Sequence, residues 1–90
     1  MPVTVKIPSP LRTLTGGAAT VDCAPGTVGD LIDQLDDSYP GFRDRVCQDG
    51  ELRRFVNVFV AGEDVRFSDG IATVTTDGQE VTILPAVAGG

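Results

Sequence analysis

The chain has 90 residues, of which 41% are hydrophobic and 22% are charged, an ordinary composition for one globular domain. With 13 acidic and 7 basic residues, its net charge of −6 argues against nucleic-acid binding, which needs clustered positive charge. The negative charge either favours a protein partner with a basic docking surface or serves solubility alone. No apolar run approaches the length of a membrane span, about 18 residues, and we find no secretory signal. We therefore expect a cytoplasmic protein without membrane association.

The chain has two cysteines, Cys23 and Cys47, and no histidine. Because the usual zinc sites need several cysteine or histidine ligands, no metal site is expected. The lack of histidine also excludes a Cys–His nucleophile within the chain. Cys23 is in phase with Ala19 and Val21, which favours a core position. A structural role is also favoured for Cys47, and a disulfide between the two would be unusual in a cytoplasm.

The first half of the chain predicts two strands and a helix. Alternating apolar residues predict strands over 3–7 and 18–23, which we expect to pair in antiparallel fashion. Thr27 is predicted as the N-cap of a helix and Asp30 as its partner in a capping box. Apolar residues then recur at helical spacing: Val28, Leu31, Ile32 and Leu35. A short second helical segment is expected over 42–47.

The second half predicts strands. The segment 55–60 is rich in β-branched and aromatic residues, and it is the clearest strand in the sequence. We expect a turn at 61–64 and then a short strand at 65–67. The final strand is predicted over 79–84, with Pro85 ending the ladder because proline has no N–H to donate.

The order β-β-α-β-β-β predicts an α+β domain over residues 1–85, a mixed sheet of four to five strands with one main helix on one face. By alternation, Val56, Val58 and Val60 face the helix. The opposite face should then expose Phe59 and Leu84 as an apolar patch on which a partner docks, unless the first loop covers it.

The chain ends in Gly89 and Gly90, and this end is its most informative feature. Glycine has no Cβ, so a diglycine end can pass through a channel too narrow for other residues. The reactive group would then be the main-chain carboxylate of Gly90. The preceding Ala86, Val87 and Ala88 are small and uncharged. Together these five residues predict a flexible tail that enters the active site of another protein.

Several segments together match one known family. They are the stretches 54–60 (RFVNVFV) and 63–67 (EDVRF), the Asp77-Gly78 turn and the end 81–90 (VTILPAVAGG). These residues and the strand order resemble the ThiS/MoaD family of ubiquitin-like sulfur carriers. The similarity covers essentially the whole chain and is greatest with the CysO-type carriers of cysteine biosynthesis. The resemblance implies a β-grasp fold and a protein that is no enzyme itself but a co-substrate of enzymes.

The resemblance also implies roles for particular residues. In the family, an adenylyltransferase of the ThiF/MoeB type uses ATP and magnesium to adenylate the C-terminal carboxylate. A sulfur donor then converts the adenylate into a thiocarboxylate. Carried onto this chain, Gly90 is the modified residue and 86–89 form the arm that enters the partner's active site. Phe59 and Leu84 would lie on the sheet face by which ubiquitin-like proteins are gripped. The chain itself is expected to bind no cofactor.

The CysO-type resemblance implies a recipient for the sulfur, a pyridoxal-phosphate-dependent cysteine synthase in which the thiocarboxylate attacks an aminoacrylate. A metalloprotease of the zinc isopeptidase type would then release cysteine and restore Gly90. Thiamine thiazole, molybdopterin and sulfur-containing natural products stay open as other destinations. Two further functions would use the same tail: a ubiquitin-like modifier joined to lysines of target proteins, and a permanent small subunit of an enzyme.

Overall fold

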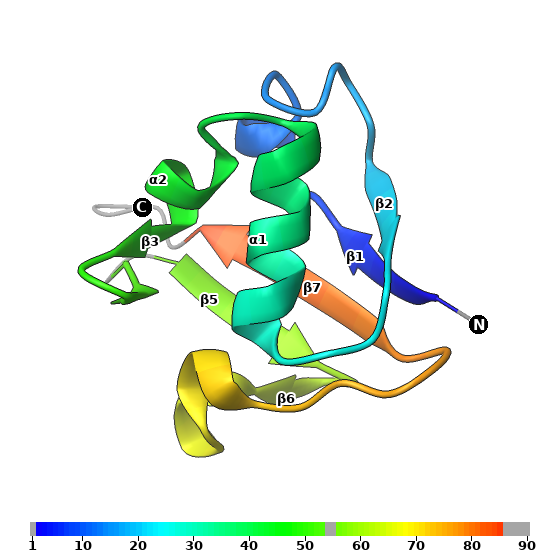
Figure 1. Ribbon diagram of the computed structural model, residues 1–90, viewed down its shortest axis with the longest axis vertical. Coiled ribbons are helices and arrows are strands. Elements are labelled where there is room, and N and C mark those ends of the chain that lie inside the picture. The colour runs from blue at the N-terminus through cyan, green and yellow to red at the C-terminus, as the bar shows by residue number, and fades with distance from the viewer. Residues whose placement is uncertain (1, 54–55, 86–90) are drawn as a thin grey trace.

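A computed structural model of the chain describes residues 2–53 and 56–85. One mixed sheet is covered on one face by the helix α1 (Figure 1). Its strands are β1 (Val3–Lys6), β2 (Thr20–Cys23), β5 (Val56–Val60), β6 (Glu63–Asp64) and β7 (Glu80–Pro85), in the spatial order β2-β1-β7-β5-β6. β1 and β7 run parallel, and the other neighbours are antiparallel. The predicted α+β arrangement with one main helix is therefore confirmed.

Helix α1 (Val28–Ser38) begins at the predicted capping box. The Thr27 hydroxyl accepts the N–H of Asp30 at 3.1 Å, and the Asp30 carboxylate accepts the N–H of Thr27 at 3.0 Å. Two of the N–H groups that a helix start leaves without partners are thereby satisfied. The apolar side of the helix is buried as predicted, through Val28, Leu31, Ile32 and Leu35.

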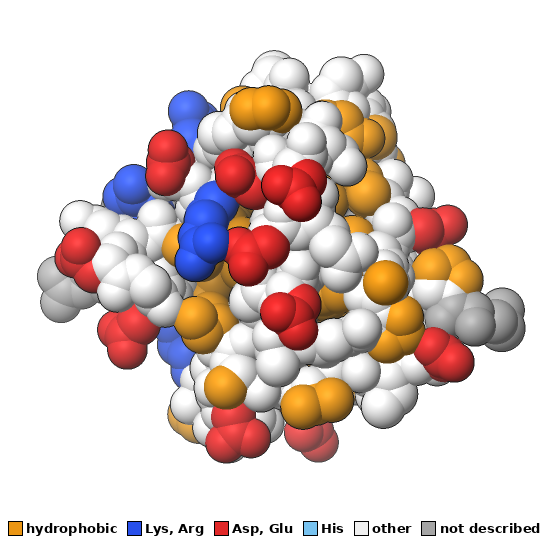
Figure 2. Space-filling view, in the orientation of Figure 1, with side chains coloured by type: hydrophobic (Ala, Val, Ile, Leu, Met, Phe, Trp, Pro, Cys, Tyr) orange, Lys and Arg blue, Asp and Glu red, His pale blue; other side chains and the backbone are white. Residues whose placement is uncertain are grey.

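Acidic side chains gather over the face that α1 covers, while basic ones lie mainly on the side of α2 (Phe42–Val46) (Figure 2). Two acidic side chains of α1 also bind the chain that follows the helix. Asp36 accepts the N–H groups of Gly41 and Arg43, each at 3.1 Å, and Asp33 pairs with the Arg43 guanidinium. The negative face of the helix thus fixes the start of α2 as well as carrying charge.

The core lies between α1 and the sheet. Its fully buried side chains come from all parts of the fold, including Val5 from β1, Leu31 from α1, Val58 from β5 and Val81 from β7. Phe42, which is 0% exposed, adds the largest of them from the first residue of α2. The chain therefore builds its core from segments far apart in sequence.

The sequence does not predict the small hairpin that follows α2. Strands β3 (Cys47–Gln48) and β4 (Glu51–Leu52) pair around a turn in which Asp49 and Gly50 both adopt positive φ. Strands of two residues are too short to show an alternating pattern.

Among the described residues, no helix is long and apolar enough to cross a bilayer.

The connection after β5 differs from the prediction. The turn consists of only Ala61 (φ 50°) and Gly62 (φ 88°), the left-handed pair typical of a two-residue hairpin. The predicted strand 65–67 is instead a 3₁₀ turn, η2 (Val65–Phe67). It forms because the Asp64 side chain accepts the N–H of Arg66 at 2.9 Å and curls the chain at that point.

Pro85 also departs from the prediction, since it lies within β7 opposite Val56 rather than ending the ladder. The N–H of Ala61 donates to the carbonyl of Glu80 at 2.9 Å, which marks a hydrogen-bonded pair between the two chain segments. Hydrogen-bonded and non-hydrogen-bonded pairs alternate along an antiparallel ladder. Counting from Ala61, the Val56–Pro85 pair is non-hydrogen-bonded. The missing N–H of proline therefore costs no bond to β5.

Candidate docking face and tail root

The predicted modification site, Gly90, and the predicted arm, Ala86 to Gly89, lie outside the described residues. The structure does describe the segment from which they continue. We call Leu84 and Pro85 the tail root; they lie opposite Asn57 and Val56 of β5. The last residues of β7 are thus held by the first residues of β5.

Phe59 and Leu84 share the face of the sheet that points away from α1. Phe59 is half-buried and lies opposite Thr82, whereas Leu84 is 46% exposed and lies opposite Asn57. This register makes Phe59 and Leu84 diagonal neighbours on adjacent strands, within reach of each other for long side chains. The structure therefore brings the two predicted residues together next to the tail root. We call the pair the docking patch.

The same face becomes polar away from the patch. On the far side of β7, Lys6 pairs with Glu80 at 3.3 Å, and the Thr4 hydroxyl donates to Asp22 at 3.3 Å. Both contacts are solvent-exposed, and such pairs contribute little stability. The apolar part of the described face is consequently concentrated near the tail root.

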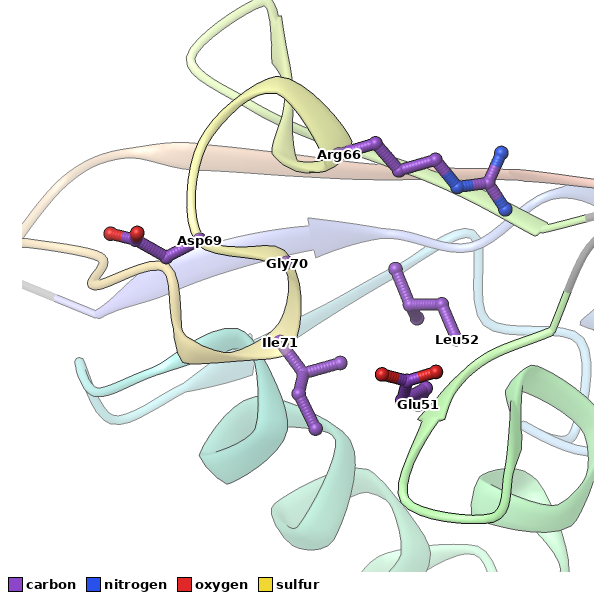
Figure 3. Close-up of a pocket in the computed structure, with 6 residues that line it drawn as sticks. All are labelled: Glu51, Leu52, Arg66, Asp69, Gly70 and Ile71. Atoms are coloured by element: carbon purple, nitrogen blue, oxygen red, sulfur yellow. The ribbon is translucent and has the colours of Figure 1, made fainter.

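Arg66 is a residue of this region that the sequence analysis missed. Its Nη2 donates to the carbonyls of Val56 at 2.8 Å and Arg53 at 2.9 Å, and its Nη1 donates to Asn57 Oδ1 at 2.7 Å. The side chain extends from η2 toward the start of β5 (Figure 3). No local pattern reveals these contacts, because each joins residues about ten positions apart.

A cavity of ≈ 320 Å³ lies between β4 and the 3₁₀ turn η3 (Gly70–Ala72). Leu52 and Ile71 are among the residues that line it, together with Glu51 and Arg66 (Figure 3). Neither residue of the docking patch contributes to its lining. The cavity is therefore not part of the docking patch.

Both cysteines are free thiols, and they are 4% and 8% exposed. Burial raises the pKa of Cys23, and the nearby Asp22 carboxylate raises it further. Burial also raises the pKa of Cys47, although Arg43 opposes the shift. The core position predicted for Cys23 is confirmed. Across residues 2–53 and 56–85, no group of three acidic or cysteine side chains is placed to hold a metal ion.

We expect both thiols to react slowly with iodoacetamide at pH 8. The reactive species is the thiolate, and a raised pKa lowers its population while burial restricts access. Peptide mass spectrometry should find each cysteine alkylated at least about tenfold more slowly than in urea-unfolded protein. Fast labelling of the folded protein at Cys47 would mean that the segment around it opens readily.

The family model described as the ThiS family matches residues 5–90. The chain belongs to the ThiS family. It is 50% identical to the sulfur carrier protein CysO of Mycobacterium tuberculosis over 93 aligned residues, which cover all of both chains. It is also 44% identical over 64 residues to the small archaeal modifier protein 3 of Haloferax volcanii, covering 71% of this chain and 70% of that protein. The resemblance to this family and to its CysO-type carriers is therefore confirmed.

The fold agrees with this assignment. A chain in the crystal structure of the Amycolatopsis orientalis BexX/CysO complex superposes with a TM-score of 0.93 at 48% sequence identity. The match covers 98% of this chain and 99% of that one. The chain therefore has the ubiquitin-like β-grasp fold that the family resemblance implied.

Proposed function

We propose that this protein is a sulfur carrier whose Gly90 carboxylate is converted into a thiocarboxylate by a partner enzyme. The observation that carries the proposal is the 50% identity to a sulfur carrier protein over the whole of both chains. The ThiS family match runs to residue 90, so it includes the diglycine end. In this role the protein performs no catalysis and acts as a co-substrate.

The chemistry explains why a partner is needed. A C-terminal carboxylate with a pKa of about 3.5 is ionised at neutral pH and is a poor electrophile. A carboxylate oxygen would attack the α-phosphorus of ATP, with release of pyrophosphate and with magnesium and ATP held by the adenylyltransferase. A sulfur donor would then attack the acyl carbon and expel AMP. The product is a thiocarboxylate whose sulfur is nucleophilic yet tethered to a protein.

The geometry of the open sheet face suits the docking part of this role. The docking patch lies next to the tail root. An enzyme that binds the docking patch is therefore close to the point from which the arm continues. The solved complex of a CysO with BexX supports the expectation that carriers of this kind work bound to a second protein. We propose a ThiF/MoeB-type adenylyltransferase as the first partner.

For the recipient we propose a pyridoxal-phosphate-dependent cysteine synthase, because the full-length likeness is to a CysO. The thiocarboxylate sulfur would attack the aminoacrylate carbon of the synthase. A zinc isopeptidase-type metalloprotease would then hydrolyse the adduct, releasing cysteine and restoring the Gly90 carboxylate. Both partners follow from the family resemblance, and the cytoplasm is the compartment in which we expect them to meet.

The direct test is intact mass spectrometry. The protein is incubated with ATP, magnesium, a sulfide source and a ThiF/MoeB-type adenylyltransferase. The expected result is a mass increase equal to the replacement of one oxygen by sulfur, absent when ATP is omitted. If an adenylyltransferase that loads a related carrier under the same conditions leaves this protein unchanged, the proposed activation by that enzyme class is wrong.

A second candidate function is protein modification, favoured by the 44% identity to a small archaeal modifier protein. In this case the adenylated Gly90 would be joined to the ε-amino group of a lysine on a target protein. The discriminating observation is a Gly-Gly remnant on lysine in digested cell extract. Its absence from cells in which the protein is abundant would count against this candidate and leave the sulfur-carrier proposal intact.

We expect Phe59→Ala and Leu84→Ala to weaken binding to the adenylyltransferase more than they weaken the fold. Truncation of a hot-spot residue at the centre of an interface costs about 2 kcal/mol or more of binding energy, which corresponds to a KM increase of roughly thirtyfold. Both side chains are partly solvent-exposed, so the free energy of unfolding should fall by only about 1 kcal/mol.

Val74→Ala is the control for this pair, because Val74 is 66% exposed and lies outside the docking patch. It should leave both KM and stability near the wild-type values. A result in which Phe59→Ala costs several kcal/mol of stability and leaves KM unchanged would place Phe59 in the core and remove the patch from the proposal.

A further inference from the structure

The edge of β5 that faces away from β7 is only partly covered by a strand. In the described part of the chain, β6 pairs with Phe59 and Val60 and reaches no closer to the start of β5. By the alternation of the β5–β7 ladder, the peptide groups of Val56 and Val58 point toward this uncovered edge. The first residues of β5 pair with the tail root on one side. On their other edge, β6 does not extend far enough to pair with them.

The guanidinium of Arg66 occupies the place of a pairing strand at this edge. Its donors reach the carbonyls of Val56 and Arg53 and the side chain of Asn57, all within 2.7 to 2.9 Å. Val56 and Asn57 are the residues directly opposite Pro85 and Leu84. One side chain from η2 thus binds the β5 segment that carries the whole tail root.

Arg66 is itself fixed in place by the backbone turn that presents it. Its N–H donates to the Asp64 carboxylate at 2.9 Å, and Val65, next to it, is 1% exposed. Arginine suits the task because its rigid planar fork can donate in two directions to several acceptors at once. A lysine ammonium would keep the charge and lose this fixed fork.

We propose that Arg66 is a positioning residue for sulfur loading, holding the start of β5 so that the tail root directs the arm into the partner's active site. The inference rests on the sulfur-carrier function proposed above. Reaction at a tethered terminus requires the reacting atoms to be placed in a near-attack geometry, and small displacements lower the rate of the chemical step. Arg66 touches no reacting atom in this role and acts through β5 and β7.

The test compares Arg66→Ala and Arg66→Lys with the control Thr75→Ala. Like the Arg66 variants, the control removes a side-chain hydrogen bond to a backbone carbonyl. Thr75 is 3% exposed, and its hydroxyl donates to the Gly26 carbonyl at 2.6 Å next to the start of α1. This contact lies near the start of β7, whereas the tail root is at the end of β7. Thr75→Ala therefore removes a buried contact to the backbone that is away from the tail root. The adenylyltransferase that loads the wild type is used for all four proteins, at a temperature at which each is folded.

We expect both Arg66 variants to lower kcat for thiocarboxylate formation at least about tenfold, with KM changed less than about threefold. Thr75→Ala should retain the wild-type kcat. Hydrogen exchange at the amides of Asn57 and Leu84 should become at least about tenfold faster in Arg66→Ala and stay unchanged in Thr75→Ala. A purely structural role of Arg66 would lower the melting temperature without changing kcat of the folded protein.

The two possible failures give different results. If the wild type is loaded and Arg66→Ala has the same kcat, the positioning role is wrong and the carrier function stands. If Arg66→Lys restores the wild-type kcat, charge rather than the forked donor matters, and the proposed clamp is wrong. If the wild type itself acquires no sulfur, the proposed function fails before any variant is compared.

Discussion

Deletion of Gly89 and Gly90 will abolish thiocarboxylate formation while leaving the melting temperature within a few degrees of the wild type. The truncated chain would end in Ala88, whose Cβ would stand beside the carboxylate and obstruct the narrow channel that we expect in the partner enzyme. Every core side chain and every ladder pair that the structure describes lies before residue 86, so the deletion keeps all of them. Intact mass measures the loading, and thermal unfolding measures the fold.

Ala88→Gly is the matched control for the deletion, because it alters the neighbouring residue and keeps the diglycine end. It should be loaded like the wild type. Loading of the deleted protein would show that the carboxylate need not belong to glycine. A large fall in the melting temperature would show that the last two residues stabilise the fold, and the model of a free arm would then be wrong.

Phe42→Ala will destabilise the protein by about 3–5 kcal/mol, because it removes a large buried side chain and leaves a cavity that the surroundings fill only in part. Phe42 is 0% exposed and is the largest of the fully buried side chains. A domain of this length has a total stability of roughly 5–10 kcal/mol. Urea unfolding at 25 °C should therefore find the variant near the limit of the folded state.

Phe67→Ala makes the same chemical change at a side chain that is 90% exposed. It should change the free energy of unfolding by less than about 0.5 kcal/mol. The difference between the two variants isolates burial from the intrinsic effect of replacing phenylalanine. Equal losses in the two proteins would contradict the core described here.

The parts of the fold that the sequence predicted are those set by neighbouring residues. The Thr27–Asp30 capping box acts over three positions, and the apolar spacing of α1 follows from the helix period, so both are recognisable from residue order alone. The alternation in β5 likewise indicated which side chains face the helix. Phe59 and Leu84 were placed on one face by this rule alone, and the structure adds that they are diagonal neighbours.

The parts that escaped prediction depend on contacts or conformations that carry no local pattern. Ala61 adopts a left-handed φ that the residue type does not favour, so the hairpin turn is tighter than the sequence indicates. Val65 to Phe67 have a composition typical of a strand, but the Asp64 side chain curls them into a 3₁₀ turn. Pro85 is tolerated in β7 because its nitrogen faces away from β5 in this register and the pairing with β1 extends only to Thr82. A single sequence reveals neither condition.

The position of β7 in the sheet has a consequence for the synthesis of the protein. This is the last strand that the structure describes, yet it is the central one, paired with β1 on one side and β5 on the other. It also supplies Val81 and Ile83, each 2% exposed, to the core. The sheet therefore cannot close on a ribosome until the segment leading into the arm has emerged. A chain that terminates before β7 would lack the middle of its sheet and would be open to proteolysis. Only chains translated through β7 can therefore complete the fold.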